Sequence, residues 1–458
     1  MSSLRLTPAI VVALSLCIAC DERTEPLATA AASSARPRAS ADPVAPTRPL
    51  ASTGRSAPAS RPEGRTYNVV LIMIDSLRAD MPWAGYPRPI APWLSRFAER
   101  STLYPRGYSL SSYTAKSVVP ALVGKYPGEL GRDGFFFTVW TPDNLLIGER
   151  AQAEGHRTLA GHGHGYFLPA LGTHQGFDDY QLLPGTHLEL TGVSNVTSEA
   201  LNQLGKRMLS DPKNTALAQG KRFFAYFHFL DPHYTYIKHE GHPDFGNERR
   251  DLYDNEVHYS DKWVGDLVDF IDAQPFGKDT AVIITADHGE GFGEHDHFRH
   301  AYQVWEALVR VPLFVRVPGA EPRRIELPRS HIDLAPTIAD LMGLKERAGF
   351  RGESLVPEVF GAPASARPVL VDLPRCDLMD RRRAFIDGDY KLISFGDDWS
   401  LELYRVSDDF KEERELSKAE PQKLAEMKQA YQAFAGKIPN VPVVGSAPLK
   451  GAPRGQRW

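Results

Sequence analysis

Several stretches of the chain consist of consecutive apolar residues of strand length. The first is Asn68–Ile74, and similar runs cover Phe223–Phe229, residues 281–285 and residues 311–315. A continuous apolar run, as opposed to an alternating one, is typical of a strand whose two faces are both buried. We therefore expect these runs to form strands of a central sheet covered on both sides.

Segments with helical patterns lie between these runs, for example residues 198–209 and 253–272. Strands that alternate with helices favour a mostly parallel sheet with helices on both faces. The predicted fold class is therefore α/β, with a doubly wound and mostly parallel sheet that spans residues 67–364.

The pattern changes after about residue 365. Short strand-like pieces at residues 368–371, 384–386, 390–394 and 402–404 are separated by turn residues, and a polar helical segment, Pro421–Ala435, follows them. This order predicts a small antiparallel α+β subdomain with a closing helix, which together with the tail covers residues 365–458.

The first twenty residues resemble a targeting segment. Arg5 supplies a positive charge, the following run to Ala19 is apolar but too short to span a bilayer, and Cys20 follows a small residue. This pattern indicates a bacterial lipoprotein signal with Cys20 as the lipidated residue, or an ordinary secretory signal cut near the same place. Residues 21–66 are rich in Ala, Pro, Ser and Arg and predict a disordered tether. We therefore expect an exported protein of the bacterial cell envelope, anchored to the membrane through the lipid.

Composition excludes two classes of protein. The chain has 458 residues and a formal net charge of −4, so it lacks the basic character of a nucleic-acid binder. It has three cysteines, of which only Cys376 lies beyond the N-terminal segment, so a disulfide framework is excluded in the folded part. We interpret Cys376 as a small, partly buried apolar residue.

Three polar clusters follow or end the predicted strands. Asp75 follows the first strand, Asp287 and His288 follow a later one, and His233 follows a third. In an open α/β sheet, functional residues gather at the carboxyl ends of the strands. Three clusters from different strands therefore predict one shared site.

A further segment, residues 113–127, has the pattern of a loop that enters a helix, with Thr114 near the helix N-terminus. Backbone N–H groups and the helix dipole at such a position stabilise anions, including an alkoxide.

These motifs together resemble the sulfatase family of the alkaline phosphatase superfamily, from about residue 67 to about residue 430. The resemblance rests on an ordered series of matches: residues 68–80, 114–127, 155–158, 176–178, 285–295, 310–319, 333–337 and 402–404.

The resemblance implies roles for individual residues. The residues at metal-ligand positions are Asp75, Thr114, Asp287 and His288. Thr114 also stands at the position of the catalytic nucleophile, and His233 and His300 lie near the positions that contact the transferred group or protonate the leaving oxygen. Lys116 is a weaker candidate for holding the anionic substrate. This ligand set suits one or more divalent cations. Because Ser76 stands where many relatives have a second aspartate, manganese or zinc is favoured over calcium or magnesium.

The nucleophile position departs from the sulfatase pattern. Sulfatases oxidise a cysteine or serine there to formylglycine and have a proline and an arginine shortly after it. Here Thr114 is followed by Val118 at the arginine position, and oxidation of threonine would give a ketone. We therefore rank phosphoester or phosphonoester cleavage above sulfate-ester cleavage. Ser112 is an alternative nucleophile, although the distance to Gly124 favours Thr114.

Other polar residues receive structural interpretations. We interpret His228 as a hydrogen-bonded core residue and His162 with His164 as part of a glycine-rich loop. His295 and His297 are loop residues for which a solvent-facing position and a functional one are equally weighted, and Glu290 and Glu294 are expected to orient their neighbours.

The predicted function is hydrolysis of an anionic ester through a covalent Thr114 intermediate. One alternative is a transferase that passes a phosphoryl-type group to an envelope glycan or lipid. A second alternative is a non-catalytic binding protein with the same fold, suggested by Ser76 and Val118.

Overall fold

The computed structural model describes residues 61–186 and 196–445. The predicted signal segment, Cys20, nearly all of the tether and the end of the tail lie outside these ranges. Within them, no helix combines the length and the apolar character needed to cross a bilayer.

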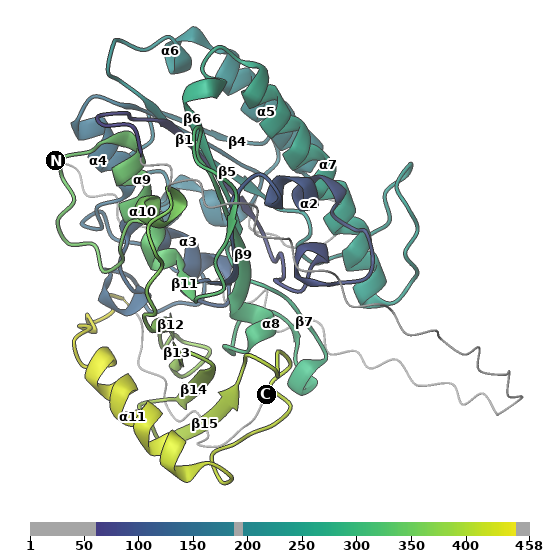
Figure 1. The fold of residues 1–458 in the computed structure, drawn as a ribbon, viewed down its shortest axis with the longest axis vertical. Coiled ribbons are helices and arrows are strands. Elements are labelled where there is room, and N and C mark those ends of the chain that lie inside the picture. Colours follow the sequence, from purple (N-terminus) through teal and green to yellow (C-terminus); the bar gives the residue numbers. More distant parts are fainter. Residues whose placement is uncertain (1–60, 187–195, 446–458) are drawn as a thin grey trace, which may run out of the picture. The chain divides into compact units, whose positions relative to one another are not determined.

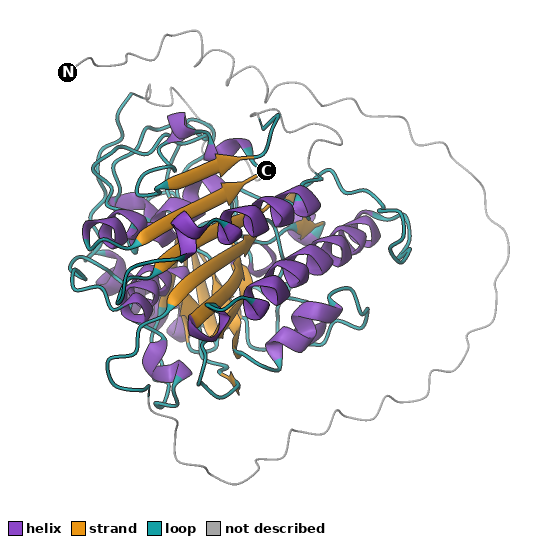
Figure 2. Ribbon diagram, turned by 90° about the horizontal axis from the view of Figure 1, so that it is seen from above, coloured by secondary structure: helices purple, strands orange, loops and turns teal. Residues whose placement is uncertain are grey.

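The central sheet has nine strands, in the order β10-β2-β9-β6-β1-β5-β3-β4, with β11 also paired to β2 (Figures 1 and 2). The strands are β1 (Asn68–Ile74), β2 (Thr102–Tyr108), β3 (Arg157–His162), β4 (Asp179–Leu182), β5 (Phe223–Phe229), β6 (Thr280–Ala286), β9 (Arg310–Arg316), β10 (Arg323–Arg324) and β11 (Arg329–Ser330).

The sheet is mostly parallel, as predicted. β1 pairs in parallel with β5 on one side and with β6 on the other, and β3 pairs in parallel with both β4 and β5. β9, predicted as residues 311–315, is antiparallel to both of its neighbours, β6 and β2. An apolar run shows that a strand is buried but does not show its direction, so the antiparallel strand could not be predicted from the sequence.

Helices cover both faces of the sheet (Figure 2). The side chains of β1 alternate between two apolar cores: Leu71 packs with residues of α3, α4 and α9, and Ile72 packs with residues of α2, α5 and α7. The helices are α2 (Pro92–Ala98), α3 (Thr114–Val123), α4 (Ile147–Ala153), α5 (Ser198–Ser210), α6 (Pro212–Thr215), α7 (Arg249–Ala273), α8 (Glu306–Val309), α9 (Leu334–Met342) and α10 (Val356–Val359).

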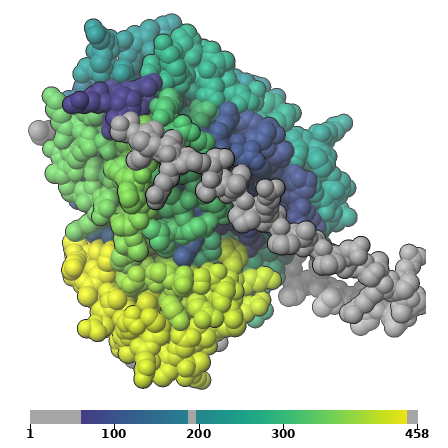
Figure 3. Space-filling view, in the orientation of Figure 1, coloured from purple at the N-terminus to yellow at the C-terminus, as the bar shows by residue number. Residues whose placement is uncertain are grey.

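The C-terminal region forms the predicted antiparallel sheet with a closing helix. Its strands are β12 (Val369–Leu373), β13 (Arg382–Asp387), β14 (Tyr390–Phe395) and β15 (Ser400–Arg405), paired in that order, and α11 (Pro421–Ala435) packs against them. Aromatic contacts such as Phe385 with Phe434 hold the helix. The residues of this region lie directly against the main body (Figure 3), and they share its larger apolar core.

The described residues begin ahead of the predicted first strand. Arg61 donates to a carboxylate oxygen of Asp340 at 2.8 Å, and Arg65 donates to Asp279 at 3.1 Å. Residues 61–66, which the sequence predicts to be part of the tether, therefore contact α9 and the segment just before β6 in the structure.

Candidate active site and metal centre

The register of three parallel strands brings the predicted site residues together. Ile74 of β1 lies opposite Ala286 of β6, so the residues that follow them, Asp75 and Asp287, emerge side by side at the carboxyl edge of the sheet. Both side chains are fully buried. On the other side of β1, His228 of β5 lies opposite Met73, two residues before Asp75.

Ser76 links the two aspartates. Its hydroxyl donates to Asp75 Oδ1 at 3.0 Å, and its backbone N–H donates to Asp287 Oδ1 at 3.3 Å. Ser76 has a φ of 59°, in the left-handed region that non-glycine residues adopt at a cost of about 1 kcal/mol. Serine therefore supplies hydrogen bonds where a second aspartate would add a third buried negative charge.

Thr114 is the first residue of α3, and its hydroxyl lies beside one of these aspartates, Asp75. Thr114 Oγ1 lies 3.3 Å from Asp75 Oδ2 and 3.3 Å from His288 Nε2. Ser117, one turn further along, donates to the backbone oxygen of Asp287 at 2.6 Å and ties the helix to the end of β6. Ser112, the alternative nucleophile, is buried, and its hydroxyl has no hydrogen-bond partner among the described residues.

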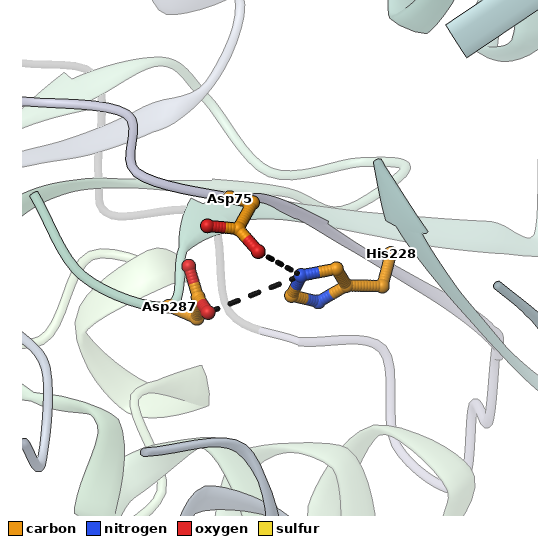
Figure 4. A group of neighbouring side chains, drawn as sticks. All are labelled: Asp75, His228 and Asp287. Carbon is orange, nitrogen blue, oxygen red and sulfur yellow. Dashed lines mark hydrogen bonds and ion pairs between the residues drawn. The ribbon is translucent and has the colours of Figure 1, made fainter. Parts of the chain in front are cut away.

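Two histidines complete this buried cluster. His288 Nδ1 donates to the carbonyl oxygen of Gly289 at 2.8 Å, which leaves the lone pair of Nε2 directed toward Asp75 and Asp287, each 3.4 Å away. His228 Nε2 lies 3.2 Å from Asp75 Oδ2 and 3.9 Å from Asp287 Oδ2 (Figure 4).

His228 was interpreted from the sequence as a core residue, and this interpretation was incomplete. The side chain is fully buried and bonds to the hydroxyl of Tyr226 at 2.8 Å, but its other nitrogen faces the site. A histidine in an otherwise apolar strand, one residue before the strand ends, is the signal that would have identified it.

The cluster fits a divalent cation. One ligand atom from each of Asp75, His228 and Asp287 can be chosen so that all lie within 4.8 Å of one another. Asp287 Oδ2 is buried without a hydrogen-bond donor among the described residues. An orphan carboxylate oxygen beside a second buried carboxylate is costly unless a cation or proton neutralises it. Two of the four ligands predicted from the sequence, Asp75 and Asp287, belong to this group, and His228 joins them in place of Thr114 and His288.

The two predicted acid or contact histidines lie beside this cluster. The centroid of the His300 ring lies 4.4 Å from the centroid of the His288 ring and 5.1 Å from that of the His233 ring. Glu290, expected to orient a neighbour, bonds to His300 Nδ1 at 3.2 Å.

The environments of these two histidines separate their pKa values. Burial is the largest effect at both and disfavours the imidazolium. At His233 burial prevails and the pKa is lowered, although Asp75 opposes it. At His300 the charge and hydrogen bond of Glu290, with Asp75 and Asp287 further away, outweigh burial and the pKa is raised. Oppositely shifted neighbours are suited to acid and base roles.

The structure does not support the prediction that Lys116 holds the substrate. Lys116 Nζ lies 3.4 Å from the carbonyl oxygen of Phe135, and burial lowers the pKa of Lys116 to about 8. Two residues along a helix correspond to about 200°, so Lys116 leaves α3 on the side opposite Thr114. Val118 and Thr114 instead line a small pocket with Trp140 and Tyr166.

Of the remaining candidate residues, some lie near the site and others lie away from it. His164 is buried with its ring 5.5 Å from that of His233, so this glycine-rich loop approaches the site after all. Asp231 caps α5 by accepting bonds from the N–H groups of Thr197 and Ser198. His295 is exposed and stacks on Trp305, away from the cluster.

Two family models match this chain. The family model "Sulfatase" matches residues 67–344, and the model "N-sulphoglucosamine sulphohydrolase, C-terminal" matches residues 293–434. An ulvan-active sulfatase from Formosa agariphila is 24% identical over 63% of this chain and 64% of its own length. A choline-sulfatase from Rhizobium meliloti is 34% identical over 27% of this chain and 24% of its own length. The chain thus spans less than two thirds of these relatives.

Solved structures show the same fold. A 2-O GAG sulfatase superposes with a TM-score of 0.68 and 18% identity, over 81% of this chain and 92% of that one. A phosphonate monoester hydrolase from Silicibacter pomeroyi superposes with a TM-score of 0.64 and 20% identity, over 82% and 96%. With the family model covering more than half of the residues, this chain belongs to the sulfatase family.

Proposed function

We propose that the protein is a metal-dependent hydrolase of phosphate diesters or phosphonate monoesters that acts through a covalent Thr114 intermediate. The observation on which the proposal depends is the position of Thr114 Oγ1, 3.3 Å from both Asp75 and His288 in a buried site. A phosphonate monoester hydrolase is among the proteins of the same fold.

A divalent cation at Asp75, Asp287, His288 and His228 would lower the pKa of the Thr114 hydroxyl and polarise the ester. We favour manganese or zinc, because imidazole ligands suit these ions better than calcium or magnesium. Asp75 is suited to this site, because the three histidines His233, His228 and His288 outweigh burial and hold its pKa well below the usual range.

In the first half of the reaction, the Thr114 hydroxyl releases its proton to bulk water, and its oxygen forms a bond to phosphorus while the bond to the leaving oxygen breaks. His300, whose pKa is raised, gives its proton to that oxygen, so an alcohol departs. In the second half, neutral His300 takes a proton from a water molecule that attacks phosphorus. The Thr114–phosphorus bond then breaks, the Thr114 oxygen recovers a proton from bulk water, and the acid product is released.

No cationic side chain of α3 faces the site, and this favours phosphodiesters and phosphonate monoesters among the possible esters. Lys116 faces away, and the pocket beside Thr114 has the apolar residues Ala115, Val118 and Val119 in its wall. A singly charged ester requires less neutralisation than a doubly charged phosphate monoester.

The test is turnover of metal-stripped protein restored with manganese, zinc, magnesium or calcium in turn. The substrates are aryl phosphate diesters, phosphonate monoesters, phosphate monoesters and sulfates. We expect metal-dependent turnover of the first two classes, lost in Thr114→Ala and retained in Ser112→Ala. Preferred turnover of sulfates would contradict the proposed ester class. Transfer to an added glycan or lipid alcohol in place of water would favour the transferase.

We also propose that the protein is exported and lipid-anchored at Cys20. This follows from the N-terminal sequence alone. Replacement of Cys20 by serine is expected to move the protein from the membrane fraction to the soluble fraction of the envelope, and an unchanged distribution would contradict the anchor.

A further inference from the structure

Two arginines lie beyond the histidine pair of the candidate active site. Arg299 directly precedes His300, and Tyr234 directly follows His233. The guanidinium carbon of Arg299 lies 3.8 Å from the centroid of the Tyr234 ring, and that of Arg249 lies 4.9 Å from the centroid of the Phe298 ring. We call Tyr234, Arg249, Phe298 and Arg299 the arginine rim.

Three of the four rim residues are exposed, and Tyr234 is half-buried. Arg249 and Arg299 are both exposed, and Phe298 is 50% exposed. Neither guanidinium forms an ion pair with any carboxylate in residues 61–186 or 196–445. Arg250, the next residue in α7, differs in pairing with Asp80 and Asp254.

Stacking on an aromatic ring fixes the plane of a guanidinium while its N–H groups remain free at the edge. Those edges match the paired oxygens of a carboxylate, sulfate or phosphate. The exposed Phe298 ring offers an apolar surface beside them. The rim therefore combines two guanidinium groups that can donate hydrogen bonds to an anion with an apolar surface on which a ring can pack.

The backbone holds this arrangement at a cost. Phe298 and Arg299 form β8, which pairs with β7 (Gly291–Phe292) in a two-stranded hairpin (β7 in Figure 1). Arg299 has a φ of 68°, and Ala301 and Tyr302 on the other side of His300 have φ values of 67° and 60°. Each non-glycine residue in this region costs about 1 kcal/mol, so the hairpin presents Arg299 and His300 in a conformation that the chain does not prefer locally.

The pair His233 and His300 marks the side on which the alcohol departs in the proposed reaction, and the rim begins one residue beyond both. From this placement we propose that the arginine rim binds the leaving group of the ester, and that its ligand is a second anionic group carried on a ring. This inference rests on the proposed function, because the leaving group is assigned from the role of His300.

The first test compares two leaving groups on one scissile bond, 4-nitrophenyl phenylphosphonate and its 3-carboxy-4-nitrophenyl analogue. We expect Arg299→Gln to lower kcat/KM for the carboxylated ester by about fivefold to tenfold, the value of a partly exposed charged hydrogen bond, with less than about a twofold change for the other. Arg249→Gln should act in the same direction. Arg207→Gln, an exposed arginine of α5, is the matched control.

A second measurement does not require turnover. Binding of the leaving alcohols themselves, 5-hydroxy-2-nitrobenzoate and 4-nitrophenol, is followed by ligand-observed NMR on the folded Thr114→Ala protein. We expect the carboxylated alcohol to bind more tightly, and this preference to disappear in Thr114→Ala with Arg299→Gln. Equal binding of the two alcohols, binding of neither, or a preference unaffected by Arg299→Gln would overturn the rim proposal. If no ester is turned over but the binding preference depends on Arg299, the rim stands and the proposed hydrolysis fails.

Discussion

The candidate active site and the junction with the C-terminal sheet each bury two carboxylates, and they neutralise them differently. At the junction, Lys391 of β14 lies 3.0 Å from Glu306 of α8 and 2.9 Å from Glu412, and all three side chains are fully or almost fully buried. Tyr108 donates to the second oxygen of Glu306 at 3.0 Å.

At the active site, Asp75 and Asp287 are equally buried, but their close charged or chargeable neighbours are histidines. Asp287 Oδ2 has no donor within the described part of the chain. The junction contains a permanent ammonium and serves stability, whereas the active site keeps a position that an exchangeable cation can fill. This difference explains how one fold can be held together by one cluster and perform chemistry with the other.

The largest expected effect is a loss of turnover without a loss of stability when the active-site cluster is altered at Thr114. Thr114→Ala should lower turnover by at least about 10⁴-fold, because loss of a nucleophile removes the covalent route. The thermal unfolding midpoint should change by less than about 2 °C, since one partly satisfied hydroxyl is removed. Steady-state kinetics and calorimetry check both parts. Turnover within tenfold of the wild type would exclude Thr114 as the nucleophile.

The next effect concerns stability at the junction. Lys391→Met should lower the free energy of unfolding by about 3–5 kcal/mol, because Glu412 would remain buried without a cation and Glu306 would keep only Arg310, 3.7 Å from its Oε2. Urea unfolding measures the loss. Lys391→Met combined with Glu306→Gln and Glu412→Gln should recover part of it. A single variant as stable as the wild type would show that the junction is not an ion-paired cluster in solution.

The next prediction concerns the pH dependence of stability at His331, a buried histidine that, unlike His300 beside Glu290, has no carboxylate as a hydrogen-bond partner in the part of the chain that the structure describes. Burial lowers the pKa of His331 to about 3, and His331 Nε2 bonds to the hydroxyl of Thr285 at 2.8 Å. With an unfolded pKa of 6.5, the unfolded state binds more protons below pH 6.5. His331 therefore contributes stability that is present above pH 6.5 and is lost as pH falls toward 3.

Between pH 7 and pH 5, this histidine should cost the wild type about 2 kcal/mol. Urea unfolding at the two pH values measures the drop in the free energy of unfolding. In His331→Gln this drop should be smaller by about 2 kcal/mol, whatever the stability of the variant at pH 7. Identical pH slopes for the two proteins would show that His331 is not buried as a neutral group.

The smallest effect tests the repulsion at the active site. In the presence of a chelator, Asp287→Asn should raise the free energy of unfolding by about 1 kcal/mol, because one of two adjacent buried charges is removed. With excess manganese or zinc the order should reverse, because only the wild type gains the full binding energy of the ion. Thermal unfolding with and without metal measures both. A variant less stable than the wild type in chelator would contradict the repulsion.

Much of the fold and most of the site follow from the sequence. Apolar runs and helical patterns located β1, β5 and α11 to the residue or nearly so, because burial and helix periodicity are local properties of the chain. Asp75, Asp287 and His288 could be placed in one site because residues that follow parallel strands meet at one edge of a sheet. Thr114 was added to that site by the resemblance to the sulfatase family. Oligomeric state and the natural substrate have no such local pattern.

Only the tertiary structure decided the direction of β9, the turning of Lys116 away from Thr114, and the entry of His228 into the metal cluster. It also brought Arg249 and Arg299, fifty residues apart in the sequence, onto aromatic rings at the rim. Each of these depends on which way a side chain or strand points relative to a distant segment. That choice is made by packing between elements, which the pattern within a single element does not contain.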